Sequence, residues 1–385
     1  MKSVLLVGCG AEIGSTLVGL LRPESDGLEI GGILTNPIAG DPKHPMLGPL
    51  NSLLARVVLA NPDMLDHVSV DDASSSLVIR GRSIPVWWGD ARNFDLESLG
   101  RRFDACILAT SKTHIGDNRV IGRFRQTSEF VLGVSEARQL PALYPNLIGA
   151  PTKFLVNKPQ PMGSSRIFAL GSCQSNGWQA MLRAVLDVAE HCDLRRLDFR
   201  SFEIDIVHPD TPTGRLGTQS FEARSQDPRD NLRPSFSQVP MAMRLIFPGV
   251  PCTNTVSLRT LVQPPGYQIC RFFFAYSTRD GRRLSRADLE ESLRKTAKAL
   301  PHMLRLADVP LGSRAYANCE STAILLMSDR LLHWFDDPFR LGVDAISELL
   351  TQSYVHNVRG YCRSVINAIK SLFDEPNLPV FLQTE

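Results

Sequence analysis

A cysteine and a histidine in this sequence are of the types that carry out nucleophilic catalysis. Cys173 lies between the apolar run 166–170 and a helical pattern, so we expect it at the first turn of a helix. Amide groups at a helix N-terminus favour the thiolate form of a cysteine and can hold an oxyanion. His208 directly follows a second apolar run. A thiol and an imidazole at two strand ends form the arrangement that a cysteine nucleophile needs.

Each of these residues also has a structural interpretation. A cysteine in a globular chain is more often an inert core residue than a nucleophile, and a histidine is more often structural than catalytic. The pairing of Cys173 with His208 is therefore a hypothesis that depends on the surrounding sequence.

The elements before Cys173 indicate a domain of the nucleotide-binding type. The β-branched and apolar run 3–7 ends in the turn Gly8-Cys9-Gly10-Ala11-Glu12-Ile13-Gly14, and a helical pattern follows. A strand, a glycine turn and a helix in this order open a dinucleotide-binding βαβ unit. The apolar runs 28–34 and 103–109 predict further strands, and 77–86 predicts a hairpin.

The second half of the chain has a different pattern, in which strand-like runs alternate with loops. Strands are predicted at 197–207, 255–262, 269–276 and 322–327, helices at 285–299, 341–355 and 360–373, and a long polar loop at 209–240. We therefore predict an α/β fold with three parts. These are a Rossmann-type doubly wound domain at 1–172, an α+β catalytic domain at 173–335, and C-terminal helices at 336–385 that pack on the first domain.

The composition argues against several classes of partner. The chain has 42 lysine and arginine residues and 40 aspartate and glutamate residues, which leaves a formal net charge of +2. No overall electric field therefore attracts nucleic acid. The apolar runs are too short for a transmembrane helix. The eight cysteines form no CxxC pair, which argues against a disulfide framework and a zinc site. The sequence thus predicts no metal, nucleic-acid or membrane partner, and a cytoplasmic location.

Six segments, in register over nearly the whole chain, resemble those of the glyceraldehyde-3-phosphate dehydrogenase family. They are Ser172-Cys173-Gln174-Ser175-Asn176, Val207-His208-Pro209-Asp210-Thr211, Val250-Pro251-Cys252-Thr253-Asn254-Thr255-Val256-Ser257, Leu331-Leu332-His333-Trp334-Phe335-Asp336-Asp337, the hairpin at 77–86, and Leu108-Ala109-Thr110-Ser111. The resemblance implies that Cys173 attacks a carbonyl and that His208 is its acid/base partner. In the family an aldehyde forms a thiohemiacetal, hydride passes to NAD, and phosphate releases a thioester. Family members are usually tetrameric, so the resemblance also implies a homo-oligomer, a dimer or a tetramer.

The positions that the resemblance assigns to a dinucleotide are altered. Candidate cofactor contacts are Gly8, Gly10, Gly14, Asn36 and Thr110. The three glycines are spaced one residue wider than the family's Gly-x-Gly-x-x-Gly loop, and Glu12 in the same turn would repel a diphosphate. Asn36 stands near the usual place of the acid that holds the adenosine ribose. Asp337 replaces the family's nicotinamide-binding asparagine.

The substrate-phosphate positions are altered as well. Candidate substrate contacts are Gln174, Asn176, Thr211, Ser237 and Gln238. Gln174 replaces the family's threonine after the nucleophile, Ser237-Gln238 replaces a Thr-Gly pair, and Gly249 replaces an arginine. Thr211 is retained.

Two hypotheses follow from a retained Cys/His pair with altered cofactor and phosphate positions. The first is a redox-independent thiol hydrolase or peptidase, which needs no cofactor and acts on a small-molecule or peptide carbonyl through a thioacyl intermediate. The alternative is an aldehyde dehydrogenase that uses NAD or NADP and a substrate other than glyceraldehyde 3-phosphate. Because Cys173 and His208 both persist, a non-catalytic scaffold is the weaker hypothesis.

Overall fold

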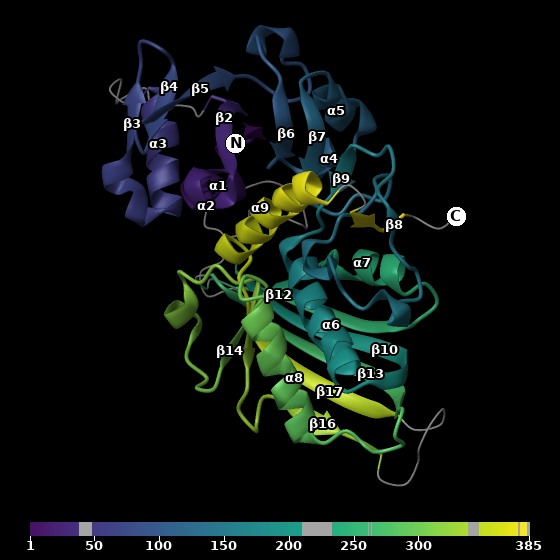
Figure 1. The fold of residues 1–385 in the computed structure, drawn as a ribbon. Helices are drawn as coiled ribbons and strands as arrows, with labels where there is room; N and C mark the ends of the chain where they lie inside the picture. Colours follow the sequence, from purple (N-terminus) through teal and green to yellow (C-terminus); the bar gives the residue numbers. More distant parts are fainter. Residues whose placement is uncertain are drawn as a thin grey trace.

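The computed structural model describes residues 1–37, 48–209, 233–260, 262, 264–337, 346–375 and 378–382 (Figure 1). Two large sheets organise this part of the chain, and helices pack against both. The fold is mixed α/β.

The first sheet has a parallel core. Its parallel strands are β1 (Lys2–Val7), β2 (Leu28–Thr35), β5 (Arg82–Trp88), β6 (Phe103–Leu108), β7 (Ser128–Gly133) and β9 (Ile167–Ala169). They lie in the order β5-β2-β1-β6-β7-β9. Numbered along the chain, this is the order 3-2-1-4-5-6 of a Rossmann-like sheet. The antiparallel strands β3 (Val68–Asp71) and β4 (Ser76–Ile79) extend the edge next to β5, and pairing of Leu77 with Ile84 confirms the predicted hairpin.

Alternate side chains of β1 explain why this sheet is covered on both faces. Val4 and Leu6 point into one apolar core, and Leu5 and Val7 point into another. Such a run without polar positions is typical of a parallel strand between two helical layers. The first core contains residues of α1 (Glu12–Leu20), α3 (Pro49–Ala60) and α9 (Arg359–Asp374), and the second those of α4 (Lys112–Ile115) and α5 (Asn118–Arg123).

The second sheet is mostly antiparallel and is covered by helices from the middle of the chain. Its strands are β10 (Leu194–Pro209), β11 (Arg233–Ser235), β12 (Cys252–Thr260), β13 (Gly266–Thr278), β14 (Leu304–Ala307), β15 (Ala323–Leu326), β16 (His333–Phe335) and β17 (Ser347–Val355). The helices α6 (Cys173–His191), α7 (Val239–Ile246) and α8 (Arg286–Ala299) share one core with it. There Trp178 of α6 lies edge-on to Phe202 of β10, which lies edge-on to Phe272 of β13.

The remaining elements are short. They are α2 (Pro23–Asp26), β8 (Gln160–Pro161), β18 (Pro379–Val380) and the 3₁₀ turns η1 (Pro62–His67), η2 (Leu96–Leu99), η3 (Phe124–Gln126), η4 (Pro145–Leu147), η5 (Thr152–Phe154) and η6 (Ser313–Tyr316). Among the helices that the structure describes, none is both long and apolar enough to cross a bilayer.

The predicted helix at 341–355 is wrong over its described part. Residues 347–355 form β17, which lies between β13 and β15 in the second sheet. Every second residue from Ser347 to Val355 is buried, which is the period of a strand. The predicted helix at 360–373 is confirmed as α9.

The helix α9 contacts elements of both halves of the molecule. It lies against α1 beneath the first sheet. Its Arg363 is buried and binds the carboxylate of Asp26 at 2.9 Å and that of Glu320 at 2.7 Å. Because Asp26 belongs to α2 and Glu320 to the loop before β15, the pairing joins elements of both halves.

Candidate active site

The turn before α6 sets the position of Cys173. Gly171 adopts a φ of +78°, a conformation that favours glycine, and turns the chain from β9 into the helix. Ser172 is the N-cap, and its Oγ accepts a hydrogen bond from the Ser175 amide at 3.1 Å. Cys173 is therefore the first residue of a 19-residue helix. The sequence forms this turn locally, because an N-cap serine and a glycine with positive φ both stop a strand and start a helix.

Cys173 and His208 lie in contact. Sγ of Cys173 is 3.7 Å from Nε2 of His208, which is near the end of β10. His208 is only 8% exposed, and Cys173 is partly buried. The pair that the sequence suggested is thus brought together by two elements that belong to different layers, a helix and the sheet beneath it.

The other described cysteines differ from Cys173 in their surroundings. Burial raises the pKa of Cys9, Cys106, Cys270 and Cys362, which keeps these thiols protonated at neutral pH. None of these four is the first residue of a helix. Among the described cysteines, Cys173 alone starts a helix and contacts a histidine.

Arg259 is a residue of this site that sequence reasoning missed. In the parallel pairing of β10 with β12, Arg259 lies directly beside His208. Its Nη1 is 3.3 Å from Nδ1 of His208, and its Nε donates a hydrogen bond to Ser235 Oγ at 2.9 Å. A single arginine in a strand pattern gives no signal of this role, because it depends on which strand pairs with β10.

The contacts of Nδ1 offer His208 two arrangements. With a proton on Nδ1, the ring donates to the Pro209 carbonyl oxygen at 2.5 Å, and Nε2 can take the proton of the thiol. With Nδ1 as acceptor of an Arg259 N–H, the proton of the neutral ring lies on Nε2 and faces the Cys173 sulfur. The first arrangement suits a base. Once Nε2 has taken a proton, the ring carries protons on both nitrogens and can act as an acid by returning the proton on Nε2.

The two predicted substrate contacts next to Cys173 have different surroundings. Gln174 is 5% exposed, and within the described chain its side-chain oxygen and nitrogen have no hydrogen-bond partner. A buried amide without partners is unusual and marks a place that a polar group could fill. Asn176 instead uses its Nδ2 to bind the carbonyl oxygens of Leu170 and Ser172, each at 3.0 Å. Asn176 therefore stabilises the turn at residues 170–173 that leads into α6.

The remaining predicted substrate contacts are not tied to Cys173 in the described chain. Ser237 Oγ accepts a hydrogen bond at 3.2 Å from the amide of Val239, the first residue of α7. Gln238 directly precedes that helix. Neither forms a hydrogen bond with Cys173 or His208 among the described residues. Thr211 lies outside the described residues.

The glycine turn after β1 has the close backbone approach of a dinucleotide loop. Gly8 has a φ of +93°, and a Cβ there would lie 2.5 Å from the Ala109 carbonyl oxygen. A Cβ on Gly14 would lie 2.4 Å from the Gly8 carbonyl oxygen. Both glycines are therefore required by the packing of strand and helix, whatever the loop binds.

Two amide groups of that turn are engaged within the protein. The Gly10 amide donates to Thr35 Oγ1 at 3.2 Å, and the Ala11 amide to the Gly8 carbonyl oxygen at 3.3 Å. Glu12 occupies the first turn of α1, where an anion would compete with a phosphate.

The two other predicted cofactor contacts lie beyond the ends of the two strands that flank β1. Asn36 is exposed after β2, and Thr110 follows β6 with a buried Oγ1 that has no hydrogen-bond partner in the described chain.

A buried carboxyl next to the turn before α6 was also missed. Glu136 Oε2 accepts a hydrogen bond from Tyr144 Oη at 3.0 Å. Burial raises the pKa of Glu136 to about 7, against the lowering effect of hydrogen bonds from Ser175, Tyr144 and the Ser172 amide. A proton on this group is therefore in equilibrium near neutral pH directly behind Cys173. Glu136 lies in an irregular loop after β7, so no sequence period marks it.

No protein-family model matches the chain, and no curated protein matches it either. Within the described residues, no group of three or more His, Cys, Asp or Glu side chains could hold a metal ion.

Proposed function

We propose that the protein is a cysteine-dependent hydrolase or peptidase on a glyceraldehyde-3-phosphate dehydrogenase-like scaffold. The observation that carries the proposal is the contact between Cys173 Sγ and His208 Nε2 at the first turn of α6. The proposed substrate is a small molecule or peptide with an amide or ester carbonyl. The proposed reaction needs no cofactor.

The first step forms a thioacyl bond. His208 takes the Cys173 proton on Nε2, and the sulfur adds to the carbonyl carbon. The negative charge then moves to the carbonyl oxygen. Amides of the first turn of α6 are not all used within the helix, so they can receive this oxyanion.

The next steps return the enzyme to its starting state. The carbon–nitrogen or carbon–oxygen bond breaks, and His208 gives its proton to the leaving amine or alcohol. Water then adds to the thioester while His208 takes one of its protons. The carbon–sulfur bond breaks, the acid leaves, and the thiol is restored. No electrons are transferred, so no hydride acceptor is needed.

Arg259 supports this alternation from behind the ring. Its guanidinium lies beside Nδ1, and Ser235 holds it there. A fixed positive charge next to an imidazolium favours release of the proton. Arg259 thereby promotes the transfer to the leaving group.

The strand order 3-2-1-4-5-6 favours a second candidate, an aldehyde dehydrogenase that uses NAD or NADP. In that case Cys173 would bind an aldehyde, and the first sheet would hold the dinucleotide. The engaged amides of Gly10 and Ala11 and the carboxylate of Glu12 argue against it. Calorimetric titration with NAD and NADP separates the two candidates, because saturable binding of either would favour the dehydrogenase.

The proposed function is tested by trapping the thioacyl intermediate. We expect p-nitrophenyl acetate, without any dinucleotide, to acetylate Cys173, as seen by intact mass and peptide mapping after acid quenching. Cys192→Ala is the matched control and should leave the adduct unchanged. An adduct spread over several cysteines, or none on Cys173, would overturn the proposal.

A further inference from the structure

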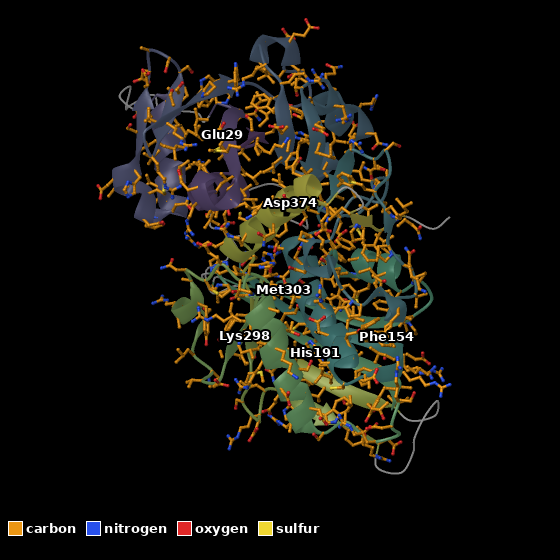
Figure 2. All side chains as sticks on the ribbon, in the orientation of Figure 1. Glu29, Phe154, His191, Lys298, Met303 and Asp374 are labelled. Carbon is orange, nitrogen blue, oxygen red and sulfur yellow. The ribbon has the colours of Figure 1, made fainter. Side chains whose placement is uncertain are left out.

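A cavity lies away from the Cys173–His208 pair, at the junction between the two halves of the molecule. Its volume is about 270 Å³. It is bounded by α9, by α6, by the turn at η4 and by the turn between α8 and β14. Figure 2 labels two of its lining residues, Asp374 at the end of α9 and Met303 just before β14. Its polar and charged lining residues include Asn146, Arg183, His302, Asn367, Lys370 and Asp374.

One buried hydrogen-bond donor and two cationic side chains line this cavity. Asn367 Nδ2 is buried and has no hydrogen-bond partner in the described chain. Arg183 uses Nε for Asp187 at 2.7 Å and Nη1 for the Ile148 carbonyl oxygen at 2.7 Å, which leaves Nη2. Lys370 Nζ makes one long hydrogen bond, 3.3 Å, to the Ser25 carbonyl oxygen. The buried donor of Asn367 without an acceptor is unfavourable, so the cavity favours a ligand that supplies an acceptor.

The charges around the cavity also favour an anionic ligand. Lys370 contributes a cation from α9, and Arg183 contributes one from α6 that Asp187 partly balances. Asp374 is the opposing carboxylate at the exposed end of α9. Burial lowers the pKa of His302, and the positive charges of Arg363, Lys370 and Arg183 lower it further. The field at His302 is therefore positive, and the ring is neutral at pH 7 with one N–H to donate.

We propose that this cavity binds a small oxyanion, a carboxylate or a phosphate, between α6 and α9. An anion of this kind accepts from Asn367 Nδ2, Arg183 Nη2 and the His302 ring together, and Lys370 balances its charge. The volume of about 270 Å³ fits inorganic phosphate or a short dicarboxylate.

Binding there would couple the two halves of the molecule. Helix α9 packs against α1 under the first sheet, and α6 packs on the second. Tyr361 on α9 also donates its hydroxyl to the Gly171 carbonyl oxygen at 2.6 Å, directly before the catalytic turn. A ligand bound by both helices therefore stabilises the turn that carries Cys173. Anion binding in this cavity does not depend on the proposed reaction.

The test is isothermal titration of the full chain with inorganic phosphate and, separately, with malonate, at a constant ionic strength set by sodium chloride. We expect saturable binding of one or both in the millimolar range or tighter, with a rise in melting temperature of about 2–4 °C at saturation. The stronger of the two ligands identifies the oxyanion source. Absence of saturable binding for both would overturn the proposal.

Two variants and one control test whether the anion binds in this cavity. Lys370→Met removes a cation of the cavity, and Asn367→Asp replaces the unpartnered donor with a carboxylate of nearly the same shape. Each variant should weaken anion binding at least 5-fold. The first loses a charge-assisted hydrogen bond, and the second places a repelling negative charge beside the anion. Lys298→Met removes an exposed lysine of α8 that does not line the cavity and should leave the affinity unchanged (Figure 2). Equal weakening in all three variants would show nonspecific ion binding and overturn the proposal. Circular dichroism verifies that each variant folds.

Discussion

The two ends of α6 place the same residue type in opposite environments. Cys173 is the first residue of the helix, and Cys192 caps its other end. Cys173 lies beside helix N-terminal amides and His208, whereas Cys192 faces the partial negative charge of a helix C-terminus. Partial burial and the nearby carboxylate of Asp288 raise the pKa of Cys192. The comparison indicates that position in the fold, more than residue type, makes a thiol reactive.

The largest expected effect is on turnover. Cys173→Ala should reduce hydrolysis of p-nitrophenyl acetate by at least about 10³-fold, because the nucleophile is lost. Cys192→Ala should stay within about 2-fold of the unchanged protein, since that thiol lies at the far end of the helix. Equal losses in the two variants would break the comparison.

Alkylation rates measure the comparison directly. At pH 7, iodoacetamide should label Cys173 roughly 30-fold faster than Cys192, as followed by peptide mass spectrometry, because the thiolate is the reactive form. His208→Ala should slow labelling of Cys173 about 10-fold. The matched control is His191→Ala, at the last residue of α6, where the ring binds Ser292 Oγ at 2.7 Å. If both histidine variants slow the reaction equally, His208 has no specific role.

The buried carboxyl of Glu136, next to the turn before α6, should make stability depend on pH. Glu136 keeps its proton up to about pH 7 in the folded state, but the unfolded chain releases it near its ordinary value. Unfolding free energy should therefore fall as pH rises from about 4.5 to 7, by at most about 3 kcal/mol. Glu136→Gln should remove this fall and become more stable than the unchanged protein above pH 7.

Urea unfolding between pH 5 and 8 checks this dependence. Glu190→Gln is the control at the other end of α6, where the exposed carboxylate pairs with Lys153 at 2.8 Å. That variant should keep the pH dependence of the unchanged protein. A Glu136→Gln curve parallel to that of the unchanged protein would exclude a buried, protonated Glu136.

The smallest expected effect concerns Arg259. Arg259→Met should reduce p-nitrophenyl acetate turnover about 3–10-fold and shift the pH profile of turnover upward, because the imidazolium would lose its proton less readily. Arg271→Met is the control, since Arg271 lies on β13 and pairs with Asp205 instead. An unchanged pH profile in Arg259→Met would show that Arg259 only supports the sheet.

Much of the fold could be predicted from local patterns. The run Val4–Val7, the glycine turn and the helix after it occur where the sequence placed them, because a short apolar strand and a helix start have local signals. The strand 347–355 was mistaken for a helix. The spacing of its apolar residues fits both a helix and a strand. Only its pairing with β13 and β15 makes it a strand.

The candidate site likewise has features that follow from local sequence and features that depend on tertiary contacts. The position of Cys173 at a helix start is local, since Gly171 and Ser172 supply the turn and the cap. The sequence alone determined this first residue of α6 and the strand that ends near His208. Only the tertiary structure decided that the two side chains meet at 3.7 Å, that Arg259 lies beside the ring, and that Glu136 is buried behind the turn. Strand pairing and layer packing join residues far apart in the chain, and such contacts leave no periodic signal in the sequence.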